Sequence, residues 1–218
     1  MKVWAIIPVK PLHDSKSRLA HVLSPEERAA LTSQILESTI SVLKGVKEIE
    51  RILVVSRDRK ALKVARREGA STFNETDKQG LNSALTRASH IAAAKKADGV
   101  LILPADLPYI TAEDVEMMIG QVNQEVVIGG NSDNGRQQRA ISICGDLNLD
   151  GSNALLVCPP TGFTFQYGPN SYILHQEEAS RLGMSVRIID APGLKFDIDT
   201  EEDWNEYQSI QMNFVSTV

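Results

Sequence analysis

Three aspartates stand where carboxylates can bind a metal ion. Asp106 follows the apolar run Val100 to Leu103, and one proline on each side of it, Pro104 and Pro108, stiffens its backbone. Mg²⁺ prefers oxygen ligands of this kind, usually one or two carboxylates together with phosphate oxygens. Asp197 and Asp199 are two residues apart, so on a strand they point to one face and repel each other unless a cation lies between them. We therefore predict that Asp106 and this pair bind a divalent cation, with a turn or a helix cap as the structural alternative.

A basic loop offers the complementary chemistry. Lys10, Lys16 and Arg18 occur within nine residues, directly after the apolar run Val3 to Val9. In open α/β sheets, ligands bind beyond the carboxyl ends of the strands, so these cations are placed to hold a triphosphate. The loop contains no glycine and therefore matches neither the Walker loop of ATPases nor the fingerprint of dinucleotide-dependent oxidoreductases. Taken alone, the loop is equally explained as a solvated basic surface.

Three polar segments can bind the rest of a substrate. Gly80-Leu81-Asn82 opens an Ala-rich helix, where free backbone N–H groups and the Asn82 amide can read the edge of a base. Two loops, at residues 150–154 and 168–171, each offer backbone N–H groups and a hydroxyl for an anionic acceptor. As isolated features, all three segments are more commonly turns and helix starts.

The elements that position these residues alternate between strand and helix. The run Val3 to Val9 is continuous and apolar, as is typical of a strand buried on both faces. Ser24 can cap the following helix, with Pro25 in its first turn and Glu27 completing a capping box. The βαβ order that follows implies a largely parallel sheet with right-handed crossovers. The other elements predicted in this half are strands at 52–55, 71–73 and 100–103, and helices near 59–68, 81–96 and after Thr111.

The second half departs from this alternation. Strands at 126–129, 140–144 and 154–157 follow one another without long helices, so we expect a mixed or antiparallel part of the sheet. Residues 131–139 are polar and contain glycine, which indicates a hairpin tip or a surface loop. Thr200 opens the last helix.

Length and composition exclude several classes of protein. The 218 residues fit a single domain, which we predict to span residues 1–218. The net charge of −5 gives no electrostatic footprint for nucleic acid, and no apolar stretch approaches the length of a membrane span. Two cysteines, Cys144 and Cys158, are explained as buried thiols in a reducing cytosol. We expect a cytoplasmic protein that acts on small molecules without an organic cofactor.

Five short motifs occur along the chain in a fixed order. The set in this order is specific to one protein family, whereas any single motif is not. Through these motifs and their order, the chain closely resembles the 2-phospho-L-lactate guanylyltransferase family from Val3 to about Tyr207. That family makes the activated lactyl intermediate for the deazaflavin coenzyme F(420). The motifs are Ile7-Pro8-Val9-Lys10-Pro11 with Lys16-Ser17-Arg18-Leu19, Leu103-Pro104-Ala105-Asp106-Leu107-Pro108, Asn153-Ala154-Leu155, Phe165-Gln166-Tyr167-Gly168-Pro169-Asn170-Ser171 and Asp197-Ile198-Asp199-Thr200.

The resemblance implies a fold and a set of ligands. The implied fold is a Rossmann-like nucleotidyltransferase fold of the glycosyltransferase-A type, and the implied donor is GTP. Many family members have threonine where this chain has Ser152, and serine keeps the hydroxyl. Residues 131–150 match the family poorly, as an insertion would, and a homodimer is expected as the commonest assembly.

The resemblance also assigns residues to each ligand. The metal carboxylates, which would hold Mg²⁺, are Asp106, Asp197 and Asp199. The acceptor, a small phosphorylated acid, is assigned to Ser152, Asn153, Gly168 and Ser171. The nucleotide is assigned to Pro8, Val9, Lys10, Lys16, Ser17, Arg18, Gly80, Leu81, Asn82 and Pro104, and the catalytic residues are Lys10, Lys16, Arg18 and Asp106.

The implied reaction transfers GMP from GTP to 2-phospho-L-lactate or phosphoenolpyruvate and releases pyrophosphate. The acceptor phosphate is already an anion near neutral pH, so catalysis rests on positioning and charge neutralisation rather than on a general base. The sequence leaves 3-phosphoglycerate open as a third acceptor. Other functions also stay open: nucleotidyl transfer to a molybdopterin or a sugar phosphate, glycosyl transfer, and GTP binding by a catalytically silent regulator.

Overall fold

A seven-stranded sheet forms the centre of the protein. The computed structural model describes residues 1–75, 80–123 and 139–215. Its strand order is β3-β2-β1-β4-β6-β5-β7, and β1 pairs in parallel with both β2 and β4 while β2 pairs in parallel with β3. The predicted α/β fold with a largely parallel sheet is therefore confirmed. The strands are β1 (Val3–Val9), β2 (Ile49–Ser56), β3 (Ser71–Asn74), β4 (Gly99–Ile102), β5 (Ala140–Gly145), β6 (Ser152–Cys158) and β7 (Ser185–Ile188).

The second half of the sheet is mixed, as expected. β6 runs antiparallel to both β4 and β5, whereas β7 is parallel to β5. Ile102 at the end of β4 lies opposite Leu155, so the first residues of β6, Ser152 and Asn153, reach the edge at which β1 and β4 end. The predicted strand at 126–129 lies outside the described residues. The reversal of β6 therefore brings a second set of polar residues to the carboxyl edge of the parallel strands.

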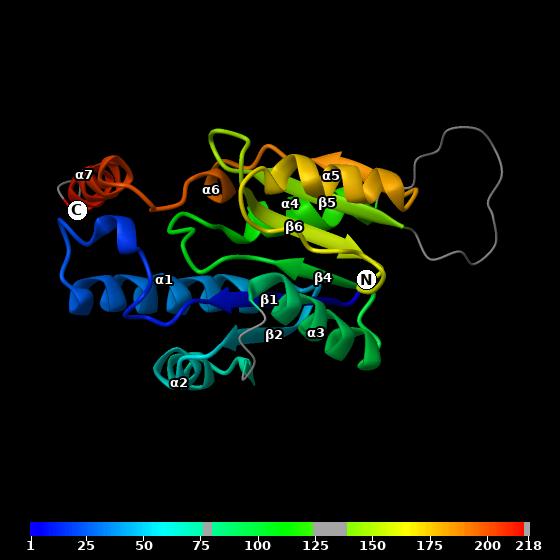
Figure 1. The fold of residues 1–218 in the computed structure, drawn as a ribbon, viewed down its shortest axis with the longest axis horizontal. Helices are drawn as coiled ribbons and strands as arrows, with labels where there is room; N and C mark the ends of the chain where they lie inside the picture. Colours follow the sequence, from blue (N-terminus) through cyan, green and yellow to red (C-terminus); the bar gives the residue numbers. More distant parts are fainter. Residues whose placement is uncertain (76–79, 124–138, 216–218) are drawn as a thin grey trace.

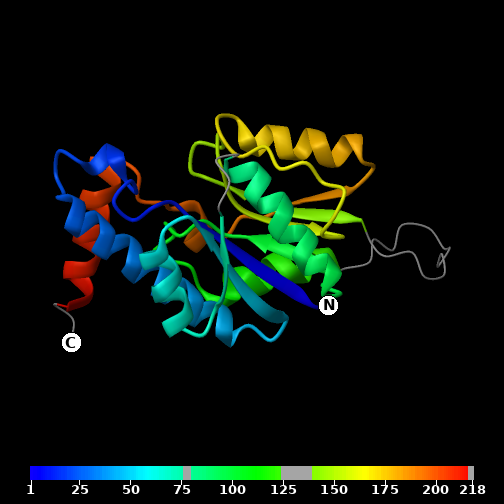
Figure 2. The ribbon, with the colours of Figure 1, turned by 60° about the horizontal axis from the view of Figure 1, so that its bottom comes forward.

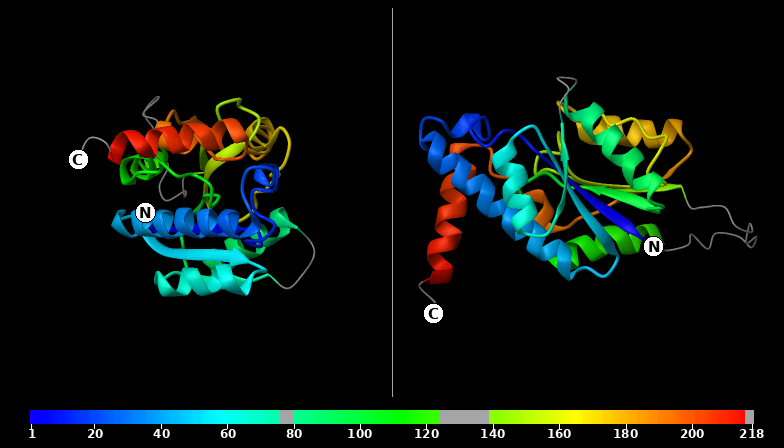
Figure 3. Two further views of the ribbon diagram at one scale, coloured as in Figure 1. Left: turned by 90° about the vertical axis from the view of Figure 1, so that its left-hand side faces the viewer. Right: turned by 90° about the horizontal axis from the view of Figure 1, so that it is seen from below.

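Helices cover both faces of the sheet (Figure 3). Residues of α1, α2, α4 and α6 share one hydrophobic cluster with β1, and residues of α3 and α5 share a second cluster on the opposite face. Among the described helices, none is both long and apolar enough to cross a membrane. The helices are α1 (Pro25–Gly45), α2 (Arg59–Arg67), α3 (Leu81–Ala94), α4 (Ala112–Asn123), α5 (Ser171–Arg181), α6 (Pro192–Lys195) and α7 (Glu201–Val215), with a 3₁₀ turn, η1, at Ser17–Leu19.

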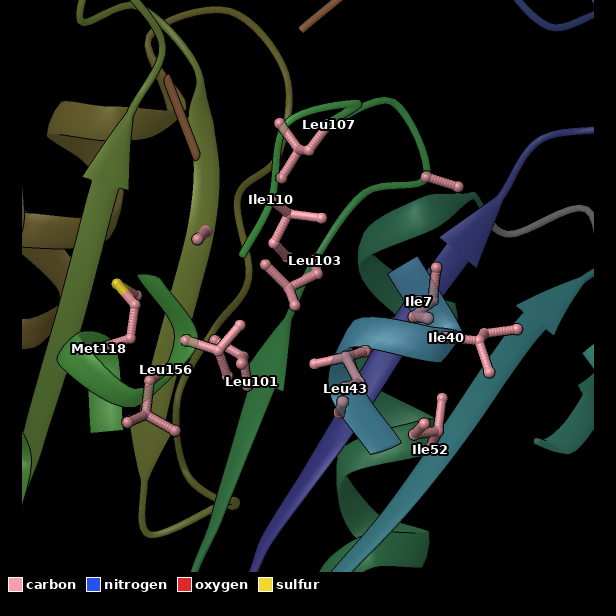
Figure 4. Packing of buried hydrophobic residues seen from close by; sticks show 14 of the residues in the cluster. Ile7, Ile40, Leu43, Ile52, Leu101, Leu103, Leu107, Ile110, Met118 and Leu156 are labelled. Carbon is pink, nitrogen blue, oxygen red and sulfur yellow. The ribbon is translucent and has the colours of Figure 1, made fainter. Parts of the chain in front are cut away.

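The alternation of side chains along β1 divides the two clusters. Ile7 points into the cluster under α1, where Ile40 and Leu43 of α1 and Ile52 of β2 pack around it (Figure 4). Trp4, three residues earlier, packs on the opposite face. Each large aliphatic side chain buried in this way contributes roughly 1.5–3 kcal/mol to folding, so β1 anchors both layers.

A third, smaller cluster lies at the carboxyl edge of the sheet. It joins Leu19 and Leu23, near η1, to Phe196 and Ile198, and Trp204 of α7 packs against it. Figures 1 and 2 show α7 beside the loop that follows β1, at the end of the molecule toward which β1 points. This cluster holds two segments, separated by about 180 positions of sequence, against each other.

Helix ends follow the signals in the sequence. Ser24 Oγ accepts a hydrogen bond from the Glu27 N–H, and the Glu27 carboxylate accepts one from the Ser24 N–H, which completes the predicted capping box of α1. At α7, the Asp203 carboxylate accepts from the Thr200 N–H at 2.7 Å, and the Thr200 hydroxyl accepts from the Asp203 N–H. Thr200 therefore caps the last helix, as predicted.

Candidate functional site

The three predicted aspartates come together. Asp106, Asp197 and Asp199 each offer a carboxylate oxygen, and these oxygens lie within 4.8 Å of one another. Asp106 follows β4, as expected, but the expectation that Asp197 and Asp199 lie on a strand is wrong, because residues 196–200 are irregular. The Ile198 N–H donates to the Asp106 carbonyl instead of to a strand. The segment is thus tied directly to the loop after β4.

The Asp199 side chain is not used as a helix cap. The N–H groups of Asp199 and Thr200 both donate to the Asp203 carboxylate, at 2.9 and 2.7 Å. The alternative that Asp199 merely caps α7 is therefore excluded, because Asp203 and Thr200 perform that task. The Asp199 carboxylate faces the other two aspartates.

Burial makes this cluster unfavourable while it carries three negative charges. Burial raises the pKa of Asp197 to about 6, and the neighbouring carboxylates of Asp106 and Asp199 add to the rise. Burial also raises the pKa of Asp106, although the Lys16 and Lys10 ammonium groups oppose that rise. Half-buried carboxylates in such contact are stabilised by a hard divalent cation, which takes oxygen ligands. The donor set therefore fits a metal such as Mg²⁺.

The basic loop lies against the same carboxylates. Lys16 has a left-handed backbone with φ of 49°, and its Nζ donates to the Ile198 carbonyl at 2.6 Å, between the two aspartates of that segment. Arg18 Nη1 lies 3.5 Å from Asp199 Oδ2, with the Arg18 side chain 73% exposed. The loop is thus placed to hold an anion beside the acidic cluster.

A buried arginine supports this loop, and the sequence analysis did not find it. Arg28 of α1 is buried, and its Nη1 donates to the Ser15 carbonyl at 2.9 Å. Ser15 Oγ in turn bonds the Leu12 carbonyl and lies 2.9 Å from the Thr32 hydroxyl. Asp58, the cap of α2, accepts from the Leu12 N–H at 2.8 Å. The sequence contained one indication that Arg28 is buried. It lies seven residues before Ile35, which places it on the apolar side of α1.

The two polar loops predicted for the acceptor touch each other. The Ser152 N–H donates to Ser171 Oγ at 3.0 Å, and the Asn170 N–H donates to Asp150 Oδ1 at 2.9 Å. Both serines are almost fully buried, at 4% and 2% exposure. Gly168 has φ of 138°, a conformation that favours glycine, so the turn before α5 depends on it. The loops thus form one unit at the start of α5.

Asn153 joins this unit to the acidic cluster. Its Nδ2 donates to the Lys195 carbonyl at 3.1 Å and to Asp197 Oδ1 at 3.3 Å. Asn153 is buried, and its bond to the carboxylate favours the ionised form of Asp197. The amide group of Asn153 therefore orients a predicted metal ligand, and its role in binding the acceptor stays a prediction.

Asn82 makes different contacts from those expected of a base-reading residue. Its Oδ1 accepts from the Tyr167 N–H at 2.8 Å, and its Nδ2 donates to the Tyr167 carbonyl at 3.1 Å. The side chain therefore pairs with the backbone that leads to Gly168. Gly80 has φ of 85°, which favours glycine at the start of α3, and Leu81 is 40% exposed. The nucleotide role of these three residues stays a prediction.

The remaining predicted nucleotide residues lie along the same edge of the sheet. Pro8 and Val9 end β1, Ser17 begins η1, and Pro104 follows β4. Lys10, the first residue after β1, is exposed. The sheet therefore brings the first loop, the loop after β4 and the start of β6 to one edge, which the reversal of β6 makes possible.

A basic loop and three clustered carboxylates lie together at the carboxyl edge of the parallel strands, where open α/β sheets bind ligands. Solved structures with a similar fold belong to the class of nucleotidyltransferases and glycosyltransferase-like proteins. The fold is similar to a nucleotide-diphospho-sugar transferase from Desulfovibrio desulfuricans, with a TM-score of 0.71 at 16% identity over 95% of this chain and 87% of that one. It is also similar to a cytidylyltransferase from Leptospira borgpetersenii, with a TM-score of 0.59 at 16% identity over 96% and 86% of the two chains.

Sequence comparison identifies the family within that class. A family model described as "Guanylyl transferase CofC like" matches residues 2–210, so the chain belongs to this family of enzymes that transfer GMP. It is 36% identical to a phosphoenolpyruvate guanylyltransferase of Rubrobacter xylanophilus, over 93% of this chain and 92% of that protein. It is 31% identical to a 2-phospho-L-lactate guanylyltransferase of Methanothermobacter thermautotrophicus, over 94% and 84% of the two chains.

Proposed function

We propose that this guanylyltransferase moves GMP from GTP to a small acid that carries phosphate on its second carbon, namely phosphoenolpyruvate or 2-phospho-L-lactate. The relatives from Rubrobacter and Methanothermobacter are named for these two acceptors. Within the family this transfer serves coenzyme F(420) biosynthesis, and we propose the same use here. The observation that carries the proposal is Asn153, which links the acidic cluster to the two serine loops at one edge of the sheet.

On the donor side, the chain neutralises charge. Lys10, Lys16 and Arg18 lie around the carboxylates and can offset the negative charge of the triphosphate. Asp106, Asp197 and Asp199 would hold Mg²⁺, which, when bound, supplies Lewis-acid neutralisation of phosphate oxygens. The buried hydrogen bond from Arg28 to the Ser15 carbonyl holds the backbone of the loop, which would position the cations before the substrate arrives.

On the acceptor side, the chain orients a nucleophile. A phosphate oxygen of the acceptor attacks the α-phosphorus of GTP, the bond from that phosphorus to the bridging oxygen breaks, and pyrophosphate leaves. The attacking oxygen carries its own negative charge, so no residue has to remove a proton. We propose that the loops around Ser152 and Ser171 hold the acid in line with the donor, since effective concentration and alignment account for much of such a rate.

The experiment is pyrophosphate release from purified protein with Mg²⁺. GTP, ATP and CTP serve as donors, each with phosphoenolpyruvate, 2-phospho-L-lactate, 3-phosphoglycerate or no acceptor. Release that requires GTP together with one of the first two acids is the expected result. Release with 3-phosphoglycerate alone would contradict the acceptor class. GTP binding without release in any combination would instead support a silent regulator.

A further inference from the structure

We propose that His175 is a positioning residue, which fixes the hydrogen-bond direction at Ser152 so that the serine presents its hydroxyl proton to an anionic group of the acceptor. This inference rests on the proposed function and adds a residue that the sequence analysis did not select. His175 lies on α5 and is fully buried, with 0% exposure. Three residues after Tyr172 and four before Ala179, it lies on the buried face of that helix.

The backbone determines which ring nitrogen of His175 carries the proton. The Gln166 N–H donates to His175 Nε2 at 2.9 Å, so Nε2 must present a lone pair. The neutral ring therefore carries its proton on Nδ1, which lies 2.9 Å from Ser152 Oγ and donates to it. Burial supports the neutral state, because it lowers the pKa of His175 to about 4.

This direction leaves the hydroxyl proton of Ser152 free for a ligand. Ser152 Oγ accepts from His175, and among the described residues the structure gives that oxygen no other partner. Ser171 is in the same situation, because its Oγ accepts the Ser152 N–H and makes no other hydrogen bond among the described residues. A hydroxyl that already accepts one bond donates its own proton in the next. Two neighbouring hydroxyl donors at the start of α5 suit a carboxylate or a phosphate.

The surroundings of His175 hold the ring and the loop in place. The Tyr167 ring meets the imidazole edge-on, with centroids 4.8 Å apart, and the Phe163 ring lies 5.8 Å away on centroids. Glu178 accepts the Thr164 N–H at 3.0 Å, so α5 fixes the backbone at two alternate positions before Gly168. The imidazole is therefore a rigid connection between this segment and the first residue of β6.

Two amide substitutions separate the two bonds of the ring. The side-chain nitrogen of asparagine is separated from Cα by the same number of bonds as histidine Nδ1. His175→Asn can therefore still donate a hydrogen bond to Ser152. The amide of glutamine reaches as far as Nε2, so His175→Gln can still accept from the Gln166 N–H but cannot donate to Ser152. The two variants remove the same ring and leave similar volume, so each controls for the structural effect of the other.

The test measures steady-state kinetics of both variants with GTP and with whichever acceptor the wild-type protein uses. We expect His175→Gln to raise the KM of the acceptor by about 10- to 100-fold, as loss of a hydrogen bond to a charged group would. His175→Asn should stay within about threefold, and the KM of GTP should not change in either. An unchanged acceptor KM in His175→Gln, or equal rises in both variants, would overturn the inference.

A second measurement does not depend on turnover. Nitrogen-15 NMR of the histidine rings, with His175 assigned by its absence in His175→Gln, reports which nitrogen carries the proton. A proton on Nδ1 is expected between pH 6 and 8, and a proton on Nε2 would overturn the inference whatever the acceptor is. Wild-type protein that releases no pyrophosphate, but shows the Nδ1 proton, would overturn only the proposed function.

Discussion

The site has two parts of different chemistry. The acidic side consists of Asp106, Asp197 and Asp199, and the serine side consists of Ser152, Ser171 and His175. Around Asp106 and Asp197, like charges are crowded together and partly offset by Lys16. Ser152, Ser171 and His175 are instead joined by hydrogen bonds between neutral groups. The acidic side has the oxygen ligands that a cation would need, whereas the polar groups of the serine side bond one another. Under the proposed function, the acidic side would neutralise phosphate charge and the serine side would orient the acceptor.

The same physical cause shifts the ionisation of both sides. Burial disfavours the charged form, which raises the pKa of Asp197 to about 6 and lowers the pKa of His175 to about 4. Both groups therefore move toward neutrality, but they do so from opposite charges. Variants that alter one side and leave the other intact test whether the two sides act separately.

The largest effect is expected on the acidic side. Asp106→Asn keeps the shape of the side chain but removes a negative charge from the predicted metal site, so turnover should fall by at least about 1,000-fold. The same change relieves repulsion with Asp199, so the metal-free variant should melt no lower than the wild type. Pyrophosphate release and thermal unfolding, each with Mg²⁺ or a chelator, measure the two outcomes.

Asp98→Asn is the matched control, because Asp98 precedes β4 at the opposite edge of the sheet and bonds the Lys2 N–H. It should keep wild-type turnover. Comparable activity in Asp106→Asn and the wild type would remove the acidic cluster from the mechanism.

The second effect tests the basic loop. Lys16 bonds the Ile198 carbonyl and lies close enough to Asp106 to oppose the rise in its pKa, whereas Arg18 is exposed and 3.5 Å from Asp199. Lys16→Met should therefore reduce kcat/KM for GTP by about 100-fold, the scale for one preorganised electrostatic group. Arg18→Met should have a much smaller effect. Equal losses in the two variants would show that net charge, and not the position of Lys16, matters.

The sequence could predict the acidic side better than the serine side. Asp106 follows an apolar run that forms a strand, and residues that follow parallel strands lie at the edge of the sheet where ligands bind. Its position could therefore be predicted from the sequence pattern alone. The pairing of residues 196–200 with the Asp106 loop could not be predicted in this way. It depends on the third hydrophobic cluster, which joins Leu19 to Phe196 from the other end of the chain. Periodicity reports local structure and carries no information about such contacts.

The roles of individual polar side chains were the least predictable. Asn153 lies near the start of β6 and Asn82 near the start of α3, positions that suit a ligand, and both bond protein groups. His175 and Arg28 look like ordinary members of amphipathic helices, but both are buried and bond the backbone of a site loop. A single sequence gives residue types and spacing, whereas the partner of a buried polar atom is fixed by tertiary geometry.

The third effect is on stability as a function of pH, in the presence of a chelator. The folded protein binds a proton at His175 only near pH 4, whereas the unfolded chain does so near 6.5, so stability from this group is lost as pH falls through that window. Between pH 7 and 5 the loss is about 2 kcal/mol. Asp197 has the opposite effect, because its pKa of about 6 in the folded protein exceeds the ordinary 3.8. As the pH falls from 7 to 5, this group adds about 1 kcal/mol to the free energy of unfolding.

Denaturant unfolding at several pH values can separate these two contributions. Asp197→Asn should lose stability more steeply on acidification than the wild type, and His175→Gln should lose less or gain. Glu178, whose pKa is lowered to about 2 mainly by Arg181, contributes mostly below pH 5 and so stays outside the window. Parallel pH profiles for the two variants would mean that burial does not control these groups.

The smallest effect is expected from Ser152→Thr, which tests whether the serine side selects by shape or only by its hydroxyl. Threonine keeps the oxygen that accepts from His175 and adds one methyl group in a site where the residue is 4% exposed. The family resemblance implies that threonine is accepted at this position, so the KM of the acceptor should change by less than about threefold. Ser152→Ala removes the donor and should raise that KM by about 10-fold or more. A large rise with threonine would mean that packing around β6, and not the hydroxyl proton, governs acceptor binding.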